Sequence, residues 1–236
     1  MIRLLLAAAV ALAGPAWVGR FSGEGGPPPP WRVVRLDKQV PATLYRGATI
    51  DGVRAIEARA EAAMALLARP LAVDLAATPV LCWRWRVDAP VAGADMRTRR
   101  GDDYAARVYV SFDMPDSALG LAARLRIALG RRLFGSQVPD AALNYVWDNR
   151  HPAGTRRRSA YTDRVEMIVA ETGGDRAGQW VAERADVGAD FARAFGNRPG
   201  RPIQLAIASD TDNTGGRARA AFADLHFVAR GERCAR

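Results

Sequence analysis

The sequence predicts a mainly β protein, an antiparallel β-sandwich with one or two short helical insertions. Two observations carry this prediction. Apolar and polar residues alternate with a period of two in several separate segments, as in strands that turn one face to a core. Clusters rich in Gly, Asn, Asp and Pro bound these segments, at residues 173–175, 197–200 and 212–216. Short strands separated by such turns, with little helix, are typical of a sandwich.

The chain has 236 residues, which is enough for one domain with a full core. It begins with a short positive region and an apolar stretch at residues 4–13, a pattern typical of a signal peptide. Residues 11–13, Ala-Leu-Ala, offer a cleavage site, with later alternatives around Ala16. The stretch is too short to span a bilayer as a mature helix, and an uncleaved anchor is the alternative. We therefore expect a periplasmic or secreted protein with no transmembrane span in its mature form.

Composition divides the chain into four parts. Residues 1–21 are the expected leader, and residues 22–30, with four consecutive prolines, are expected to form a linker that does not pack. A single β-sandwich domain is expected over residues 31–230, followed by a tail at residues 231–236. No internal repeat or second linker interrupts this domain.

The chain is strongly basic, with a formal net charge of +9. This charge is almost entirely arginine, since Lys38 is the only lysine. The arginines are spread along the sequence, apart from residues 156–158, and no nucleic-acid-binding motif accompanies them. We therefore expect no nucleic-acid partner.

Two strands are the clearest elements, at residues 81–87 and 106–112, because both alternate strictly. Their core face holds Trp83, Trp85, Val108 and Val110, which we expect to pack with Leu205 and Ile207. Their opposite, polar face holds Arg84, Arg86, Arg107 and Tyr109. We expect both strands to lie in one sheet, so that these polar side chains share one binding face for an anionic or polyhydroxyl ligand.

The remaining elements are shorter or ambiguous. Residues 53–67 are rich in alanine and fit either a helical stripe or two strands. Helices are expected at residues 117–134, capped by Asp116, and at residues 190–195, ending at Gly196. Further strands are expected at residues 145–147, 165–169, 203–207 and 221–227.

Two pairs of side chains extend the candidate binding face. Asp102 and Asp103 precede the second clear strand and point to opposite sides of an extended chain, so an ion pair with an arginine is favoured over a ligand role. Tyr145 and Trp147 lie on one side of a later strand, where their rings suit the core or, less often, stacking on a sugar. The full set of candidate ligand-binding residues is Arg84, Arg86, Asp102, Asp103, Arg107, Tyr109, Tyr145 and Trp147.

Asp210, Asp212 and Asn213 gather three side-chain oxygen donors within four residues, just after a predicted strand. Hard cations such as Ca²⁺ prefer oxygens of this kind on a loop. A polar hairpin, closed by Asp and Asn side chains that bond their own backbone, explains the same residues and is favoured. A structural Ca²⁺ is the alternative, and no other cofactor is expected.

Nucleophilic catalysis has little support, and we expect no catalytic residue of that kind. The chain has no G-x-S-x-G motif and only two histidines, His151 and His226. A Cys82–His226 dyad is disfavoured because Cys82 lies between apolar neighbours. A zinc site is disfavoured because the chain has only two histidines and two distant cysteines to serve as ligands. Whether Cys82 and Cys234 form a disulfide stays open, since pairing depends on geometry.

Several segments taken together, at residues 83–87, 101–110, 145–147, 210–214 and 221–227, resemble the bacterial family known as domain of unknown function 3047. The resemblance covers nearly the whole chain after residue 30. It implies a jelly roll related to galactose-binding and carbohydrate-binding sandwiches. It also implies that residues 53–67 form two strands, since tertiary context overrides a weak helical propensity.

These observations favour an exported, non-catalytic binding module for a carbohydrate or cell-envelope glycan. One alternative is an envelope polysaccharide hydrolase that uses acids such as Asp102, Asp103 or Glu166, which would need two facing carboxyl groups in a pocket. Another is a structural or interaction protein whose arginine face is ion-paired. Acidic partners beside the arginines would favour this last alternative.

Overall fold

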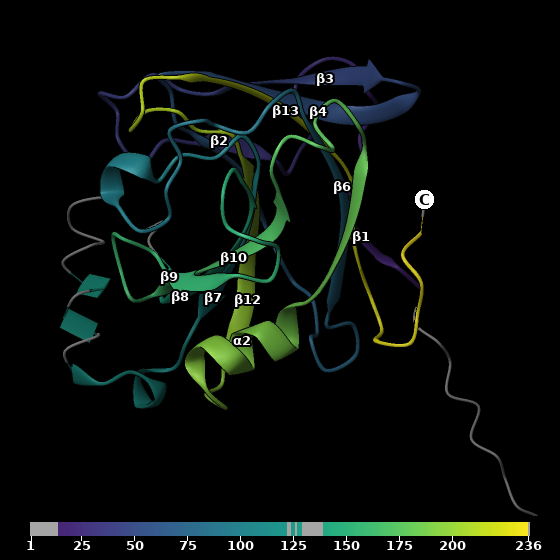
Figure 1. Cartoon of the computed structure of the whole chain (residues 1–236). Coiled ribbons are helices and arrows are strands. Elements are labelled where there is room, and N and C mark those ends of the chain that lie inside the picture. The colour runs from purple at the N-terminus through teal and green to yellow at the C-terminus, as the bar shows by residue number, and fades with distance from the viewer. Residues whose placement is uncertain (1–13, 122–123, 126, 129–138, 236) are drawn as a thin grey trace, which may run out of the picture.

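The computed structural model describes residues 14–121, 124–125, 127–128 and 139–235 (Figure 1). Two sheets pack face to face, which confirms the predicted β-sandwich. Sheet A has the order β11 (Val181–Asp186), β6 (Val80–Val87), β13 (Arg217–Val228), β4 (Val53–Glu61) and β3 (Leu44–Ile50), with β1 (Ala16–Gly19) also paired to β13. Sheet B has the order β2 (Arg32–Val34), β5 (Leu66–Pro70), β12 (Arg201–Ala208), β7 (Arg107–Asp113), β8 (Ala141–Asp148), β10 (Val165–Thr172) and β9 (Arg156–Arg158).

Strand pairing differs from the expected pattern in one place. Among the described residues, neighbouring strands pair antiparallel except β8 and β10, which run parallel. The ambiguous segment 53–67 forms β4 and the start of β5, as the family resemblance implied. Its alanines suit strands here because Ala58 and Ala60 lie in the tightly packed interior opposite β13.

Helices are few among the described residues. Helix α2 (Val187–Phe195) begins at its N-cap Asp186, whose side chain accepts a hydrogen bond from the Ala189 amide, and ends at Gly196. It confirms the predicted helix at 190–195, starting three residues earlier. The other predicted helix, 117–134, lies partly outside the described residues, and its start is the 3₁₀ turn η2 (Asp116–Ala118). No helix in the described part of the chain is long and apolar enough to cross a membrane.

Four aromatic rings join the two sheets in the centre of the core. Trp83 and Trp85 of β6 meet Tyr145 and Trp147 of β8, with ring centroids 5.5 Å apart for Trp83–Tyr145 and 5.8 Å apart for Trp85–Trp147. All four side chains are buried. The Tyr145 hydroxyl donates to Asp190 of α2, and the Trp147 indole donates to the Gly173 carbonyl. The buried indole nitrogen of Trp83 has no hydrogen-bond partner among the described residues. Tyr145 and Trp147 are thus core residues with no free face for stacking on a sugar.

The domain begins earlier in the chain than expected. Residues 16–19 form β1 inside the predicted leader, and Val18 and Phe21 are buried. The predicted linker is not free of contacts either, because the Gly47 amide of β3 donates to the Gly25 carbonyl. Composition misled the prediction here: Gly and Pro prevent a helix or a central strand, but they do not prevent a segment from packing along the outside of one.

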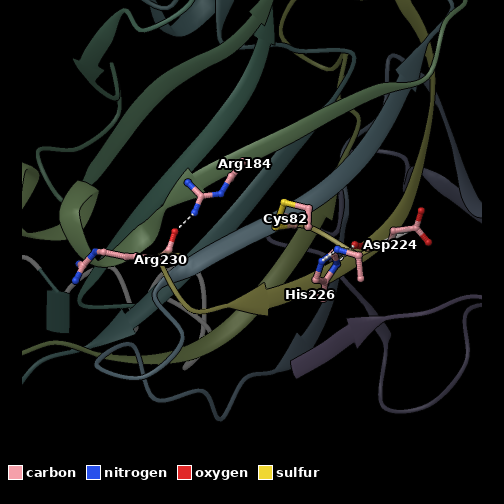
Figure 2. The surroundings of a disulfide bond; sticks show 7 residues. Cys82, Arg184, Asp224, His226 and Arg230 are labelled. Atoms are coloured by element: carbon pink, nitrogen blue, oxygen red, sulfur yellow. Dashed lines mark hydrogen bonds between the residues drawn. A yellow bond between two sulfur atoms is a disulfide. The ribbon is translucent and has the colours of Figure 1, made fainter. Parts of the chain in front are cut away.

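The two cysteines form a disulfide, Cys82–Cys234, which joins β6 to the C-terminal segment. Figure 2 shows this bond beside His226 and Asp224 of β13. The cysteines are 152 residues apart in sequence, so the bond closes a long loop of the unfolded chain. The expected tail at 231–236 is therefore tied to sheet A.

Removing the disulfide should lower the free energy of unfolding. Cys234→Ser is expected to cost about 2–5 kcal/mol, because the unfolded chain regains the freedom that the long closed loop removes. Urea unfolding with and without a thiol reductant measures the effect. The reductant should destabilise the natural chain and leave the variant unchanged, whereas equal stability of the natural chain in both conditions would contradict the paired state.

Glu183 should make stability depend on pH. Its carboxylate accepts a hydrogen bond from the Trp85 indole at 3.2 Å, and burial, with the charge of Glu171, raises its pKa to about 7. The folded state then binds a proton that the unfolded state has already lost, so the stability from this group falls as pH rises from about 5 to 8.

Glu183→Gln keeps an acceptor for Trp85 and removes this titration. We expect the difference between the free energies of unfolding at pH 5 and pH 8 to shrink in the variant, as measured by urea unfolding at both pH values. A variant with the same pH dependence as the natural chain would show that Glu183 does not titrate in this range.

Candidate functional site

Most of the predicted polar residues meet at one corner of the molecule, around Arg107. Arg107 begins β7, and Val108 next to it faces the core, so strand alternation directs Arg107 to the outer face of sheet B. We call this group the Arg107 cluster. Its members are Asp102, Asp103, Arg107, Asp210, Asp212 and Asn213.

Arg107 is buried, with only 2% of its surface exposed, and it is held by two carboxylates. Its guanidinium donates to Asp210 at 2.7 and 2.5 Å and to the Asp102 carboxylate at 3.2 Å. It also donates to the Asp102 carbonyl, and it lies over the Tyr104 ring at 4.5 Å. A buried guanidinium needs such partners because its desolvation is costly.

Asp103 holds the neighbouring loop. Its carboxylate accepts hydrogen bonds from the Asn213 amide, the Asn213 side chain and the Thr214 amide, at 3.2, 3.0 and 2.6 Å. The two adjacent aspartates thus point to opposite sides, as expected: Asp102 pairs with an arginine, and Asp103 binds a loop. The preceding 3₁₀ turn η1 (Arg99–Gly101) brings both of them to the start of β7.

Three carboxylates of the cluster are close enough to share a cation. Asp103, Asp210 and Asp212 each offer an oxygen within 4.8 Å of the other two. Asp103 replaces the predicted Asn213 in this set, because Asn213 uses its side chain to bind Asp103 and Tyr161. Arg107 already supplies a positive charge to Asp210, although burial still raises the pKa of Asp210 to about 7.

An exposed tyrosine, which the sequence did not single out, borders the cluster. Tyr161 is 50% exposed, and its hydroxyl donates to Asn213 Oδ1 at 2.7 Å. The guanidinium of Arg99 lies 5.2 Å from its ring centroid. Burial of the hydroxyl and the charges of Asp102 and Asp212 raise the pKa of Tyr161. An isolated tyrosine in a turn has no sequence pattern that would have indicated this role.

Arg84 and Arg86 do not join this site, so the prediction of one shared arginine face is wrong. They lie on β6 in sheet A, whereas Arg107 lies on β7 in sheet B. Arg84 pairs with Asp224, and Arg86 pairs with Asp51 at 3.0 Å. Alternation gives the face on which a side chain lies but not the sheet to which its strand belongs.

The outer face of sheet A is ion-paired over a wider area. Glu57 is buried between Arg46, Arg59 and Arg219. Although burial alone would raise the pKa of Glu57, hydrogen bonds from these three arginines lower it to about 2. Glu166 of sheet B is paired as well, with Arg158 at 3.2 Å. Many of the arginines of this basic chain therefore serve structural ion pairs.

The fold and the Arg107 cluster together describe the class of protein. It is a β-sandwich domain with a buried arginine–carboxylate cluster at the start of β7. The chain belongs to the family described as protein of unknown function (DUF3047), which matches residues 29–226. This confirms the family resemblance of the sequence. No curated protein matches the chain.

Two solved structures are distantly similar. One is the xyloglucanase domain of NopAA, a type three effector from Sinorhizobium fredii in complex with cellobiose, with 9% identity and a TM-score of 0.35 over 91% of this chain and 93% of that one. The other is the endo-1,4-β-glucanase CelB2, with 13% identity and a TM-score of 0.33 over 89% of this chain and 93% of that one. Likenesses this distant carry no argument about a ligand or a reaction.

Truncating Arg107 should strongly destabilise the domain. Arg107→Ala leaves Asp210 buried without its partner and is expected to cost about 3–5 kcal/mol. Arg217→Ala is the matched control, because Arg217 also pairs with an acid, Glu61, but both side chains are mostly exposed. The control should change stability by about 0.5 kcal/mol or less. Urea unfolding of both variants measures this, and equal losses would contradict a structural role for the buried pair.

Proposed function

We propose that this protein is an exported, non-catalytic module that binds a carbohydrate or cell-envelope glycan at Tyr161 and the adjoining edge of the Arg107 cluster. The observation that carries the proposal is the half-exposed Tyr161 ring, fixed by Asn213 beside anchored carboxylates. A flat apolar ring with polar groups at its border is suited to a sugar, which presents C–H groups on its face and hydroxyls at its edge.

The polar groups that border Tyr161 are held by other protein groups. The Asn213 side chain is held by Asp103, and Asp102 is held by Arg107, so the groups that border Tyr161 have little freedom left to lose on binding. The Oδ1 atom of Asp212 is buried and accepts no hydrogen bond, so it lies inside the corner and not on the surface that a ligand would meet.

Positive charge at the same border supports an acidic glycan. Arg99 lies against the Tyr161 ring, and Arg100 beside it is exposed. A guanidinium pairs well with a carboxylate or a phosphate, including those of uronic acids and phosphorylated envelope polymers. Export is supported by the Cys82–Cys234 disulfide, because structural disulfides persist in oxidising compartments.

Hydrolysis has less support than binding. Asp102 pairs with Arg107, Asp103 accepts three hydrogen bonds from the 213–214 segment, and Glu166 pairs with two arginines. A general acid and a nucleophile or base must face a substrate across a few ångströms, and these carboxylates face other protein groups instead. A Ca²⁺ ion shared by Asp103, Asp210 and Asp212 remains part of the proposal as a structural support of the corner.

A glycan array probed with the domain tests the proposal, with and without Ca²⁺. We expect retention of acidic glycans, and Tyr161→Ala should weaken binding about tenfold through loss of the stacking face. Leu44→Ala is the control: Leu44 is 71% exposed on β3 of the other sheet and should leave binding unchanged. Failure to retain any glycan, or unchanged binding by Tyr161→Ala, would overturn the proposal, and release of reducing ends would replace it with hydrolysis.

A further inference from the structure

Three side chains that can bind a metal ion converge on the outer face of sheet A. They are Cys82 of β6, His226 of β13 and Cys234 in the segment that follows β13, and the ligand atoms of all three lie within 4.8 Å of one another. Cys82 and His226 are cross-strand partners and lie side by side in Figure 2. The cysteines are distant in sequence, which disfavoured a zinc site, but the fold places them together beside an imidazole.

The imidazole of His226 is in the form that binds a metal. Its Nδ1 atom lies 2.6 Å from the Asp224 carbonyl, which can only accept a hydrogen bond, so Nδ1 carries the proton. Its Nε2 atom accepts a hydrogen bond from the Ala235 amide at 2.9 Å and therefore holds a lone pair. Burial lowers the pKa of His226, so the ring stays neutral. A metal-binding histidine usually has this arrangement, with one ring nitrogen on the metal and the other donating to a carbonyl or carboxylate.

The surroundings favour a cation bound by two thiolates. Arg184 of β11 is the cross-strand partner of Cys82, and a neighbouring positive charge favours the thiolate over the thiol. Cys82 and His226 are almost fully buried, and a buried site favours a complex with no net charge. Two thiolates, a neutral imidazole and Zn²⁺ sum to zero. Ca²⁺ prefers oxygen ligands, so sulfur at this site selects a softer ion such as Zn²⁺.

Cys234 can reach the position that a metal requires. Two sulfurs on one tetrahedral Zn²⁺ are about 3.8 Å apart, further than two bonded sulfurs, so one cysteine has to move outward. Cys82 is held within β6, whereas Cys234 is partly exposed and lies in a segment without helix or strand. The same exposure gives an ion, or a water in the fourth ligand position, a path to the site.

We infer that Cys82, His226 and Cys234 bind Zn²⁺ when the two cysteines are reduced, and that formation of the disulfide releases the ion. A dithiol reductant reduces the disulfide by exchange and becomes a disulfide itself, leaving two thiols that lose two protons as Zn²⁺ binds. In the reverse direction a small disulfide accepts two electrons and two protons and leaves as two thiols, while the cysteines join and Zn²⁺ departs. The inference rests on neither the glycan nor the export in the proposed function.

The first test uses Co²⁺, which occupies zinc sites and absorbs strongly when a thiolate is bound to it. The full chain is reduced without oxygen by a phosphine, which takes its oxygen from water and leaves both thiols. We expect a Co²⁺–thiolate charge-transfer band that saturates at one ion per chain and disappears when Zn²⁺ is added. The oxidised chain is the matched control and should give no such band, because its cysteines are paired. A reduced chain that gives no band, whether it is folded or unfolded, rules the site out.

Single substitutions separate this site from the carboxylates of the Arg107 cluster. His226→Gln keeps both thiols and removes the nitrogen ligand, so it should weaken Co²⁺ binding at least about tenfold. Cys234→Ser leaves one thiolate and should weaken it further. Asp212→Asn is the control that should leave the band unchanged, because Asp212 belongs to the other candidate metal site and offers only oxygen. Circular dichroism identifies the variants that fold, and binding by folded His226→Gln as tight as that of the natural chain contradicts a three-ligand site.

The second test follows the release of the ion and needs no substitution. The reduced chain is loaded with one Zn²⁺ and then oxidised with a small disulfide, while a chromogenic chelator measures free zinc and a thiol reagent counts the remaining thiols. We expect one ion to be released for each two thiols lost. Zinc that stays bound after the disulfide has formed would lie elsewhere and overturn the inference. Neither test involves a glycan, so this inference and the proposed function can fail separately.

Discussion

The packing of Trp83 and Trp85 against Tyr145 and Trp147 determines where every polar side chain on the neighbouring strands must lie. Because β6 and β8 direct their aromatic residues into the space between the sheets, the residues between them are directed outward. In β6 these are Cys82, Arg84 and Arg86, and in β7 the pairing with β8 directs Arg107 and Tyr109 outward. The two outer faces lie on opposite sides of the sandwich. One interaction in the core therefore separates Arg84 and Arg86 from Arg107.

The sequence was sufficient to predict which side chains face the core, but not which sheet each strand belongs to. Alternation within 81–87 and 106–112 identified which side chains face the core, and family resemblance resolved 53–67 as strands. The assignment of β6 and β7 to one sheet was wrong, because strands adjacent in sequence need not be neighbours in a sheet, and no local property of either strand records its partner. The parallel pairing of β8 with β10 was not predicted, for the same reason. Strand pairing is a long-range property, and only the complete set of contacts determines it.

The charged residues of the candidate site could be predicted from the sequence, but its aromatic residue, Tyr161, could not. Asp102, Asp103, Asp210 and Asn213 stood out as dense polar groups at strand ends, and such groups must find partners when the chain folds over them. Tyr161 lies alone in a turn, where an aromatic residue carries no pattern. It becomes informative only when the fold brings it against Asn213 and Arg99. Burial of Arg107 fixes the polar groups, while the Tyr161 side chain beside them stays half exposed.

His226 lies on the outer face of sheet A, and the segments that cover it explain where the domain begins. Its pairing with Cys82 places it on the outside of sheet A, where an imidazole would ordinarily be hydrated. It is nevertheless fully buried, since Trp17 covers its ring and the segment held by Cys234 caps Nε2. The apolar composition of residues 16–21 therefore has two sources: it continues a leader-like stretch, and it supplies a strand that must cover β13. Composition alone cannot separate these sources, because a leader and a buried strand use the same residues. The pairing of β1 with β13 assigns residues 16–19 to the folded domain.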